Sequence, residues 1–581
     1  MRPARLRLSL KKSVGWLLIL LVLSQLLLAC GEDNKAVTPG ITAPVTASTS
    51  GVKNTAATTA ATATPPRTTN VAVPTPTSPP NLVTSNQTLT LIGGNISTLD
   101  PALAGDTVSS FFTRQIFSGL LTLDKDMNPV PDLALAMPDV SADGTVFTFR
   151  LRPGLKFHSG APLTADDIKY SWERAADPKL AVPSLASSLP AANYMNDIVG
   201  VKEKLEGKAT DIEGIKVLDS LTLQVKTDAP KPFFLAKMTS NTFMVVNKAT
   251  VSAGFDKPDG SGPFKVIEYR KDEIMRLARN PEYQNGAPNL IQVNILLGSA
   301  ASNPLTLYEQ GKIDFVFTSG NDVERYLDKN NPLSKELVIK PQLDLQYVGF
   351  NNRLKPFDDP RIRQAFSLVV DRARIARVMF ESRVVKADSI LPPGMPGYSG
   401  NTGSLSYDIN RARDLIAQSS YRSAQNLPKI TIYSTGTAMA GLLQQVYQQA
   451  FGIEVEVRQP DYKDFQAGLA ASQFQIYIDG WAADYPDPEN FLRTLLGNGS
   501  AYNDSGYNNA EFDNLLKQGD EQRDAQKRLE MYAKAEQIAL TDAPILPLYH
   551  SVSFLLVKPY VKGLELTSSS ILSLKDVYIV K

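Results

Sequence analysis

The chain has 581 residues, well beyond the roughly 250–300 at which a single hydrophobic core stops growing, so two or more domains are expected. Apolar residues make up 43% and charged residues 20%, which is typical of an ordinary globular protein. The formal net charge of +1 lacks the basic excess that nucleic-acid-binding proteins carry, so no nucleic-acid partner is expected.

Histidine and cysteine are rare, and this excludes several kinds of site. Two His and one Cys rule out a disulfide within the chain and any metal site rich in these ligands. A catalytic centre built on histidine would need His158 or His550, and neither lies beside a nucleophile motif. Both are therefore predicted to be structural, and no metal, cofactor or catalytic residue is expected.

Residues 1–29 have the pattern of an export signal. Five Lys or Arg and no acidic residue accompany an apolar run from Trp16 to Leu28, which is shorter than the ~20 residues that span a bilayer. The run ends in Leu-Leu-Ala-Cys at Cys30, which resembles a bacterial lipobox and implies cleavage before Cys30 and a lipid on its sulfur. A plain membrane anchor is the alternative. Removal of the signal leaves 55 basic and 59 acidic side chains, a net charge of about −4.

Residues 30–85 are predicted to form a disordered tether behind the lipidated cysteine. Thr, Ala, Pro, Ser and Val dominate, few residues are charged, and neither helical nor strand periodicity is present. A flexible chain of this length reaches roughly 40 Å, enough to hold a domain away from a membrane surface. Folded structure is expected to begin near Asn86.

Strand and helix patterns then mix along the chain without a gap. Asp143-Gly144 marks a turn before a strand whose Phe147, Phe149 and Leu151 share one face. Thr164 is predicted to cap the helix that follows it. The elements expected in this part are a strand at 88–92, a helix at 108–120, a strand at 146–151, a helix from 165, and a hairpin of strands at 215–217 and 221–225.

The second half of the chain alternates helices with strands. After Arg361, residues Ile362, Ala365, Phe366 and Val369 recur at the spacing of one helix face. Alternation of this kind predicts an α/β architecture. The further elements expected are helices near 436–451, 461–471 and 525–540, and strands at 453–457, 474–478 and 545–549.

Several segments together resemble the large peptide-type (family 5) solute-binding proteins of ABC importers, the group that contains oligopeptide and dipeptide binders. The densest match is DGTVFTFRLRPGLKFHSGAPLTADDIKYSWERAADP at 143–178. The resemblance extends from about residue 87 to the C-terminus in family order. The other matching segments are GSGPF at 260–264, LARNPEY at 277–283, PFDDPRIRQAFSLVVDR at 356–372, GWAADYPDPENFL at 480–492 and AKAEQIALTDAPILPLY at 533–549.

The resemblance implies a two-lobed α/β fold like that of periplasmic binding proteins, of type II and of the large class with an extra inserted domain. In this arrangement Trp172 and Phe147 are expected in the core of the extra domain. The implied boundaries are 86–130, 243–345 and 541–581 for lobe I, 131–242 for the extra domain, and 346–540 for lobe II.

The segment Gly480–Pro488 is the most informative for ligand binding. It follows a predicted strand, and ligands of α/β folds bind at the carboxyl ends of strands. Gly480 permits close approach of another backbone, while Pro486 and Pro488 stiffen the chain. The segment is therefore predicted to be a stiff loop that presents Tyr485 and a carboxylate.

The resemblance implies that Asp484 pairs with the α-ammonium of a peptide and that Trp481 lines a side-chain pocket. A carboxylate buried between closing lobes loses several kcal/mol of hydration unless a cation pairs with it. Asp484 would then favour closure only with a cationic ligand present. The alternative is that Asp484 holds a turn, because Asp-Tyr-Pro is turn-prone.

Two weaker candidates follow from the same resemblance. The resemblance implies that Tyr347 has a family counterpart beside the cleft and that Asp106 corresponds to another acidic ligand contact. Arg361, Arg363 and Asp371 also match the family, but a charged helix face is expected to be structural.

The group that would bind a ligand carboxylate is not visible in the sequence. Oligopeptide binders often carry cations just before the Gly-Trp pair, and this chain has Ile478 and Asp479 there. Peptide length, and even peptide identity, therefore stay open.

The function expected is that of a monomeric, lipid-anchored receptor that captures peptides and delivers them to ABC permease subunits. It would lie at the outer face of the cell membrane, in a periplasmic space or on the cell surface. One alternative is the same fold with an oligosaccharide, an opine-like compound or a nickel chelate as ligand. A remote alternative is a surface hydrolase with Asp484 paired to Asp487 or Glu489.

Overall fold

The structure is a computed structural model that describes residues 86–180, 189–252, 254–318, 322–400, 405–500, 502–569 and 572–580. All of them belong to one compact unit, Pro76–Lys581. The predicted signal peptide, Cys30 and the tether lie outside the described residues. None of the helices in the described ranges has the length and apolar character needed to cross a membrane.

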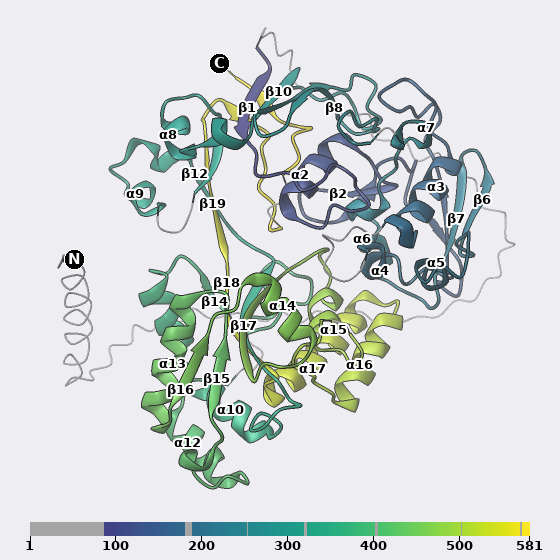
Figure 1. The fold of residues 1–581 in the computed structure, drawn as a ribbon. Helices are drawn as coiled ribbons and strands as arrows, with labels where there is room; N and C mark the ends of the chain where they lie inside the picture. Colours follow the sequence, from purple (N-terminus) through teal and green to yellow (C-terminus); the bar gives the residue numbers. More distant parts are fainter. Residues whose placement is uncertain are drawn as a thin grey trace, which may run out of the picture. The chain divides into compact units, whose positions relative to one another are not determined.

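Six sheets and the helices between them form the unit, with helices and strands mixed along the chain as predicted (Figure 1). A four-stranded sheet, β1-β10-β9-β8, and a three-stranded sheet, β11-β19-β12, use strands from both ends of the chain. Their strands are β1 (Thr88–Ile92), β8 (Phe264–Arg270), β9 (Ile274–Arg279), β10 (Gln292–Leu296), β11 (Phe315–Thr318), β12 (Leu337–Pro341) and β19 (Val552–Val557). The small two-stranded sheets are β2 (Leu121–Leu123) with β3 (Pro129–Pro131), and β20 (Val561–Lys562) with β21 (Tyr578–Ile579).

The first helix of this part ends earlier than predicted. The sequence pattern indicated a helix over 108–120, whereas α2 covers Thr107–Ile116. The carbonyl of Ile116 accepts a hydrogen bond from the backbone of Gly262 at 2.8 Å, and a side chain at Gly260 or Gly262 would overlap this carbonyl. Close approach of a distant glycine segment therefore ends the helix, a tertiary effect that local periodicity does not contain.

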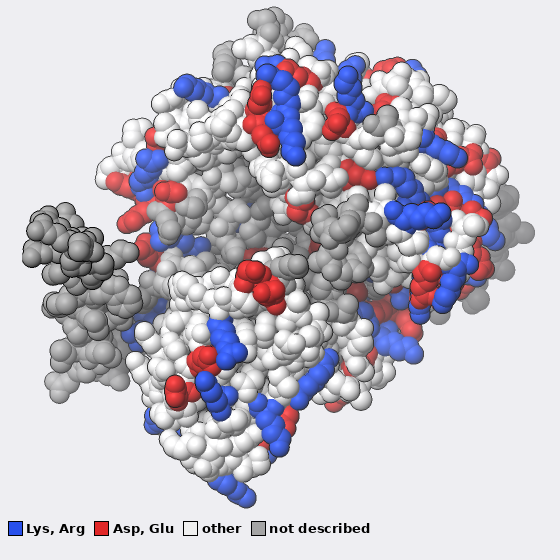
Figure 2. Space-filling model, viewed as in Figure 1, with Lys and Arg blue, Asp and Glu red and all other residues white. Residues whose placement is uncertain are grey.

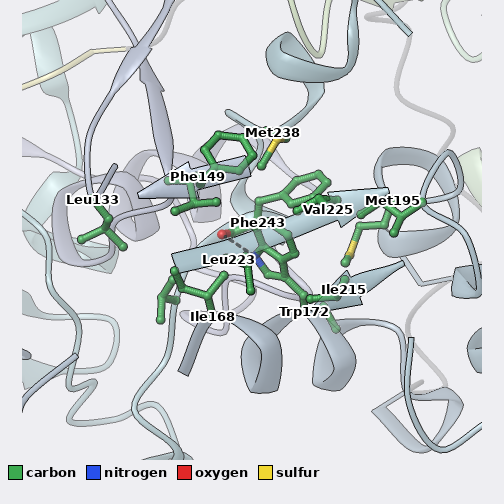
Figure 3. Packing of buried hydrophobic residues seen from close by; sticks show 14 of the residues in the cluster. Leu133, Phe149, Ile168, Trp172, Met195, Ile215, Leu223, Val225, Met238 and Phe243 are labelled. Atoms are coloured by element: carbon green, nitrogen blue, oxygen red, sulfur yellow. Dashed lines mark hydrogen bonds between the residues drawn. The ribbon is translucent and has the colours of Figure 1, made fainter. Parts of the chain in front are cut away.

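A second four-stranded sheet, β4-β5-β7-β6, packs against α3 (Ala165–Ala175) around Trp172 (Figure 3). The Trp172 indole N–H donates to the carbonyl of Phe243 at 2.9 Å, and the two rings meet edge to face at 5.0 Å. Trp172 is fully buried and Phe147 is 4% exposed, so both lie in the core as predicted. The strands are β4 (Asp139–Val140), β5 (Val146–Arg150), β6 (Ile215–Asp219) and β7 (Thr222–Lys226).

The largest sheet has six strands in the order β14-β18-β13-β17-β15-β16. One face packs against α10, α12 and α13 through an apolar cluster that includes Val348, Phe350 and Ile476. The other face carries Tyr347 and Tyr477 against apolar residues of α14, α15, α16 and α17. The strands are β13 (Asp344–Phe350), β14 (Val385–Lys386), β15 (Ile430–Tyr433), β16 (Val455–Arg458), β17 (Ile476–Ala482) and β18 (Ile545–His550).

The helices of this part begin and end close to the predicted positions. In α10, Asp359 caps the first turn through the Arg361 N–H, and the predicted apolar face of Ile362, Ala365 and Phe366 is fully buried. The helices are α10 (Pro360–Leu368), α11 (Arg372–Arg374), α12 (Ile409–Gln418), α13 (Thr437–Phe451), α14 (Tyr462–Ala470), α15 (Glu489–Leu496), α16 (Ala510–Glu521) and α17 (Ala525–Asp542). The short helices earlier in the chain are α4 (Ala191–Tyr194), α5 (Val201–Leu205), α6 (Phe234–Lys237), α7 (Lys248–Val251), α8 (Pro304–Glu309) and α9 (Glu324–Leu327).

The chain passes between the three-stranded and six-stranded sheets at two adjacent points. β12 leads into β13, and β18 leads into β19, with the Gln342 N–H donating to the Ser551 carbonyl at 2.9 Å. Within residues 541–581, predicted to belong to lobe I, β18 pairs in the six-stranded sheet and β19 in the three-stranded sheet. The domain boundaries stay a prediction.

Both histidines contact backbone. A ring nitrogen of His158 lies 3.0 Å from the Gly262 carbonyl, and one of His550 lies 2.7 Å from the Asp344 carbonyl. Burial lowers the pKa of each imidazole. On the face drawn in Figure 2, acidic and basic side chains are interspersed rather than gathered by sign.

Candidate functional site

The candidate site is built on one face of the pair β13–β17. Tyr347 lies opposite Asp479 in this antiparallel ladder, and Leu345 lies opposite Trp481. Because side chains alternate along a strand and opposed residues share a face, Tyr477, Asp479 and Trp481 project to the same side as Tyr347. The result is a row of aromatic side chains with one carboxylate among them.

The strand that carries this row is longer than predicted. It was expected to end at residue 478, but β17 runs on to Ala482, so Gly480 and Trp481 lie in the strand and not in the loop. The reason is that β13 continues the pairing as far as Asp344. A Cβ at Gly480 would meet the end of the flexible Gln346 side chain, and not another backbone as the sequence predicted.

The Tyr477 ring occupies space that is open only because residue 349 is a glycine. A Cβ at Gly349 would overlap the Tyr477 ring, which lies directly across the ladder. We expect Gly349→Ala to displace this buried ring and lower the free energy of unfolding by about 2 kcal/mol, as overpacking typically does. Gly441→Ala is the matched control, because a Cβ there in α13 meets nothing within 4 Å.

The measurement for this pair is urea unfolding followed by circular dichroism. Gly441→Ala should be neutral or stabilising, since alanine favours a helix interior over glycine. Equal stability of Gly349→Ala and the original protein would show that Tyr477 does not depend on this glycine.

Asp484 lies just beyond the strand, in contact with residues from two other elements. Its carboxylate accepts a hydrogen bond from the Asn490 amide at 3.2 Å and another from the Tyr194 hydroxyl. The Asn490 carbonyl oxygen in turn accepts from the Asp484 backbone at 3.0 Å and from the Trp481 indole at 3.1 Å. Asn490 therefore joins the two residues that the sequence singled out.

The charge of Asp484 has no ion-pair partner within the described residues. Burial raises the pKa of this carboxyl, and hydrogen bonds from Tyr194 and Asn490 and the charge of Lys237 oppose the increase only in part. Asp484 is not the N-cap of α15, which is Pro488, although its hydrogen bonds with Asn490 join the two ends of the 484–490 segment. An ionised Asp484 is thus a partly buried anion without an ion-pair partner among the described residues.

Tyr485 and Asp487, in the rest of the loop, have partners within the protein. Tyr485 is 3% exposed and donates its hydroxyl to Glu489, while the Lys237 ammonium lies 5.9 Å from the Tyr485 ring centre. Asp487 binds Arg528 at 2.6 Å. Tyr485 thus points into the protein, whereas the sequence analysis expected the loop to present it to a ligand.

The two weaker candidates lie in different settings. Tyr347 is 3% exposed and belongs to the aromatic row beside Asp479. Asp106 is the N-cap of α2, where its carboxylate accepts from the Ser109 N–H at 2.8 Å. The structure therefore gives Asp106 a local structural role and does not bring it into contact with Asp484.

The three charged residues that match the family but were expected to be structural have partners within the protein. Arg363 is buried and donates to the carbonyls of Phe357 at 2.7 Å and Asp542 at 3.0 Å. Arg361 pairs with the helix cap Asp359 at 2.8 Å. Asp371 caps α11 through the Arg374 N–H at 2.9 Å.

Two contributors from α4 were not foreseen from the sequence. Tyr194 bonds to Asp484, and the Asn193 amide donates to the Tyr502 hydroxyl at 2.6 Å. The Tyr502 ring stands 5.1 Å from the Trp481 ring. Because α4 lies about 290 residues before Asp484, no short-range pattern could have linked them.

A buried cation, Arg114 of α2, was also missed. It donates to the Thr239 carbonyl at 3.1 Å, but its Nε atom has no hydrogen-bond partner in the described structure. Burial lowers the pKa of this guanidinium to about 10, and the Tyr194 phenol acts on it electrostatically. Arg114 also lines a cavity of about 490 Å³ together with Thr239, Ser240 and Lys125.

No set of three or more His, Cys, Asp or Glu side chains arranged to hold a metal ion occurs among the described residues. The polar groups of the site are thus an acid, a guanidinium, amides and phenols. Such groups bind organic ligands through hydrogen bonds and charge.

Comparison with known proteins identifies the relatives of this chain. The family described as bacterial extracellular solute-binding proteins, family 5 Middle, matches residues 128–503. The periplasmic oligopeptide-binding protein OppA of Salmonella typhimurium is 30% identical over 509 residues, which cover 84% of this chain and 92% of that protein.

Solved structures agree in fold. The murein tripeptide binding protein MppA of Escherichia coli superposes with a TM-score of 0.70 at 26% identity, covering 86% of this chain and 99% of that one. DppA from Helicobacter pylori, solved in complex with the peptide STSA, gives a TM-score of 0.70 at 26% identity, with coverage of 85% and 98%.

Proposed function

The chain belongs to the bacterial extracellular solute-binding proteins of family 5, and from this premise we propose that it captures peptides for delivery to an ABC importer. It has the two-lobed α/β fold of this family and is an extracytoplasmic protein. The relatives that bind oligopeptides, a murein tripeptide and the peptide STSA support a peptide as the ligand.

The observation that carries the proposal is the partly buried, desolvated carboxylate of Asp484. It accepts hydrogen bonds from Tyr194 and Asn490 and has no ion-pair partner in the described residues. The α-ammonium of a peptide supplies a cation with N–H donors for the remaining lone pairs. Binding then relieves the cost of the buried charge, so ligand and closed site stabilise each other.

Arg114 supplies the complementary charge for a peptide carboxylate. Its guanidinium is buried without an anionic partner in the described part of the chain, and its Nε–H is unpaired. Tyr194 bonds to Asp484 and also acts electrostatically on Arg114, which places both charges in one neighbourhood. A zwitterionic ligand suits this pair better than a neutral sugar does.

The test is calorimetric titration of the purified full-length protein with Ala-Ala-Ala and with its N-acetylated form. We expect binding of Ala-Ala-Ala and a loss of at least about 30-fold on acetylation, since removal of a charged hydrogen-bond partner costs about 2–5 kcal/mol. Equal affinity for the two peptides would contradict the role of Asp484. Binding of an oligosaccharide or a nickel chelate, with no peptide bound, would overturn the proposal.

We propose no catalytic role for the acidic loop. A glycosidase needs two available carboxylates, but the Asp487 carboxylate is held by Arg528 and that of Glu489 accepts from the Tyr485 hydroxyl. The acids that could pair with Asp484 therefore already have structural partners.

We further propose that a lipid on Cys30 holds a monomeric receptor at the outer face of the membrane. In a bacterial host, Cys30→Ala is expected to move the protein from the membrane fraction to the soluble fraction, because the sulfur that carries the lipid is lost. Metabolic labelling with a palmitate analogue followed by fractionation measures this. Undiminished labelling and membrane retention of Cys30→Ala would contradict lipidation at this residue.

A further inference from the structure

Asp479 lies within the aromatic row and has a second carboxylate beside it. It is flanked along β17 by Tyr477 and Trp481 and faces Tyr347 across the ladder. Asp504 acts electrostatically on Tyr347 and Tyr477, as Asp479 does, and the charge of Asp479 acts on Asp504. Strand pairing thus places Asp479 among these rings, and Asp504, from the segment between α15 and α16, lies within electrostatic range of the same groups.

The polar groups of this pocket are not satisfied by the protein. The only hydrogen bond to the Asp479 carboxylate in the described structure is from the adjacent Gly480 N–H, at 2.9 Å, and Asp504 accepts none there. The hydroxyls of Tyr347 and Tyr477 likewise make no hydrogen bond within the described residues, although these side chains are 3% and 2% exposed. The two carboxylates and the two phenol hydroxyls therefore have hydrogen-bonding capacity left for a ligand.

Arg353, among the described residues, is a cation that acts on Asp504, and it has a hydrogen-bond partner elsewhere. Arg353 lowers the pKa of Asp504 electrostatically but forms no ion pair with it in the described structure. Its guanidinium donates to the Ser472 hydroxyl at 3.0 Å and packs against Gly506. The two acids therefore keep room for a cation that the protein does not supply.

We propose that Asp479 and Asp504, enclosed by Tyr347 and Tyr477, bind a basic side chain of the captured peptide, so that the protein selects ligands containing Lys or Arg. Carboxylates supply the charge, and the aromatic faces add cation–π attraction. The pocket adjoins the proposed ammonium site. Tyr502 packs on Trp481, and burial together with the charges of both Asp484 and Asp504 raises the pKa of the Tyr502 hydroxyl.

This inference rests on the proposed function and deepens it by naming a substrate class. The experiment titrates the full-length protein with alanine tetrapeptides in which one residue is Lys, placed in turn at each position. Each peptide is paired with its norleucine counterpart, which has nearly the same shape without the charge. At one position, Lys is expected to bind about 10-fold to 100-fold more tightly than norleucine, as charged hydrogen bonds imply.

The variants Asp479→Asn and Asp504→Asn assign the gain to this pocket. Each should lower the affinity for the Lys peptide about 10-fold or more and leave that for the norleucine peptide unchanged. Glu454→Gln, at an exposed position, changes the net charge equally and should alter neither affinity. Thermal unfolding of each variant without peptide checks that the fold is intact.

Proton competition gives a second readout. Burial raises the pKa of Asp479 to about 6 and that of Asp504 to about 7, and the groups that face them are Tyr347, Tyr477, Tyr502 and Arg353. A cation requires both carboxylates ionised, so the ratio of Lys to norleucine affinity should rise between pH 5.5 and pH 8. The ratio should become independent of pH in the double variant.

The outcomes separate the inference from the proposed function. Binding of both peptides with equal affinity at every position would overturn the basic-side-chain pocket and keep peptide capture. Failure of every tetrapeptide to bind would overturn the proposed function and this inference with it. A preference for Lys that survives Asp479→Asn and Asp504→Asn would place the selectivity elsewhere and overturn the assignment.

Discussion

Asp484→Asn is expected to weaken the binding of Ala-Ala-Ala by about 30-fold or more, because loss of one partner of a buried ion pair costs about 2–5 kcal/mol. The ligand-free protein should be at least as stable as before. Burial raises the pKa of the Asp484 carboxyl, so ionisation costs stability as the pH increases, and Asn removes this cost while it keeps a polar side chain.

Asp106→Asn is the matched control for this substitution. Asp106 caps α2 through the Ser109 N–H, and asparagine caps helices about as well as aspartate, so both stability and affinity should be unchanged. Calorimetry measures the affinities and thermal unfolding measures the stabilities. Retained affinity in Asp484→Asn, or an equal loss in Asp106→Asn, would contradict the assignment of the ammonium site.

The second large effect concerns stability. Trp172→Ala is expected to lower the free energy of unfolding by about 4 kcal/mol, as large-to-small substitutions of buried aromatic residues do. Trp172 is fully buried, and its loss also leaves the Phe243 carbonyl without the indole donor. Urea unfolding followed by circular dichroism measures the change.

Trp481→Ala is the counterpart at the site. Trp481 is only partly buried and its indole bonds to Asn490 beside Asp484, so peptide affinity should fall while stability changes much less. A stability loss in Trp481→Ala as large as that in Trp172→Ala would show that Trp481 belongs to the core rather than to the ligand site.

Much of the fold could be predicted because, in many segments, the local sequence pattern and the tertiary packing favour the same structure. The alternation of Phe147, Phe149 and Leu151 and the helical spacing after Arg361 both place the buried side chains correctly. Predictions failed where distant contacts decide the structure. α2 ends earlier than predicted because the Gly262 N–H donates a hydrogen bond to the Ile116 carbonyl. β17 is longer than predicted because β13 pairs with it as far as Ala482.

The site could be predicted only in part for the same reason. The resemblance singled out Asp484 and Trp481, and the structure connects them through Asn490. Tyr194 and Arg114 come from elements far away in the sequence and show no motif. The Tyr485 hydroxyl turns inward to Glu489, an orientation that a loop pattern does not determine.

The measurement that tests peptide capture most directly is native mass spectrometry of the full-length protein. The protein is equilibrated with a defined mixture of dipeptides to pentapeptides, oligosaccharides and nickel chelates, and then separated from free ligand. We predict adducts whose masses and fragments are those of peptides, and their loss in Asp484→Asn. Adducts of a sugar or chelate without peptide, or an unliganded mass only, would contradict peptide capture.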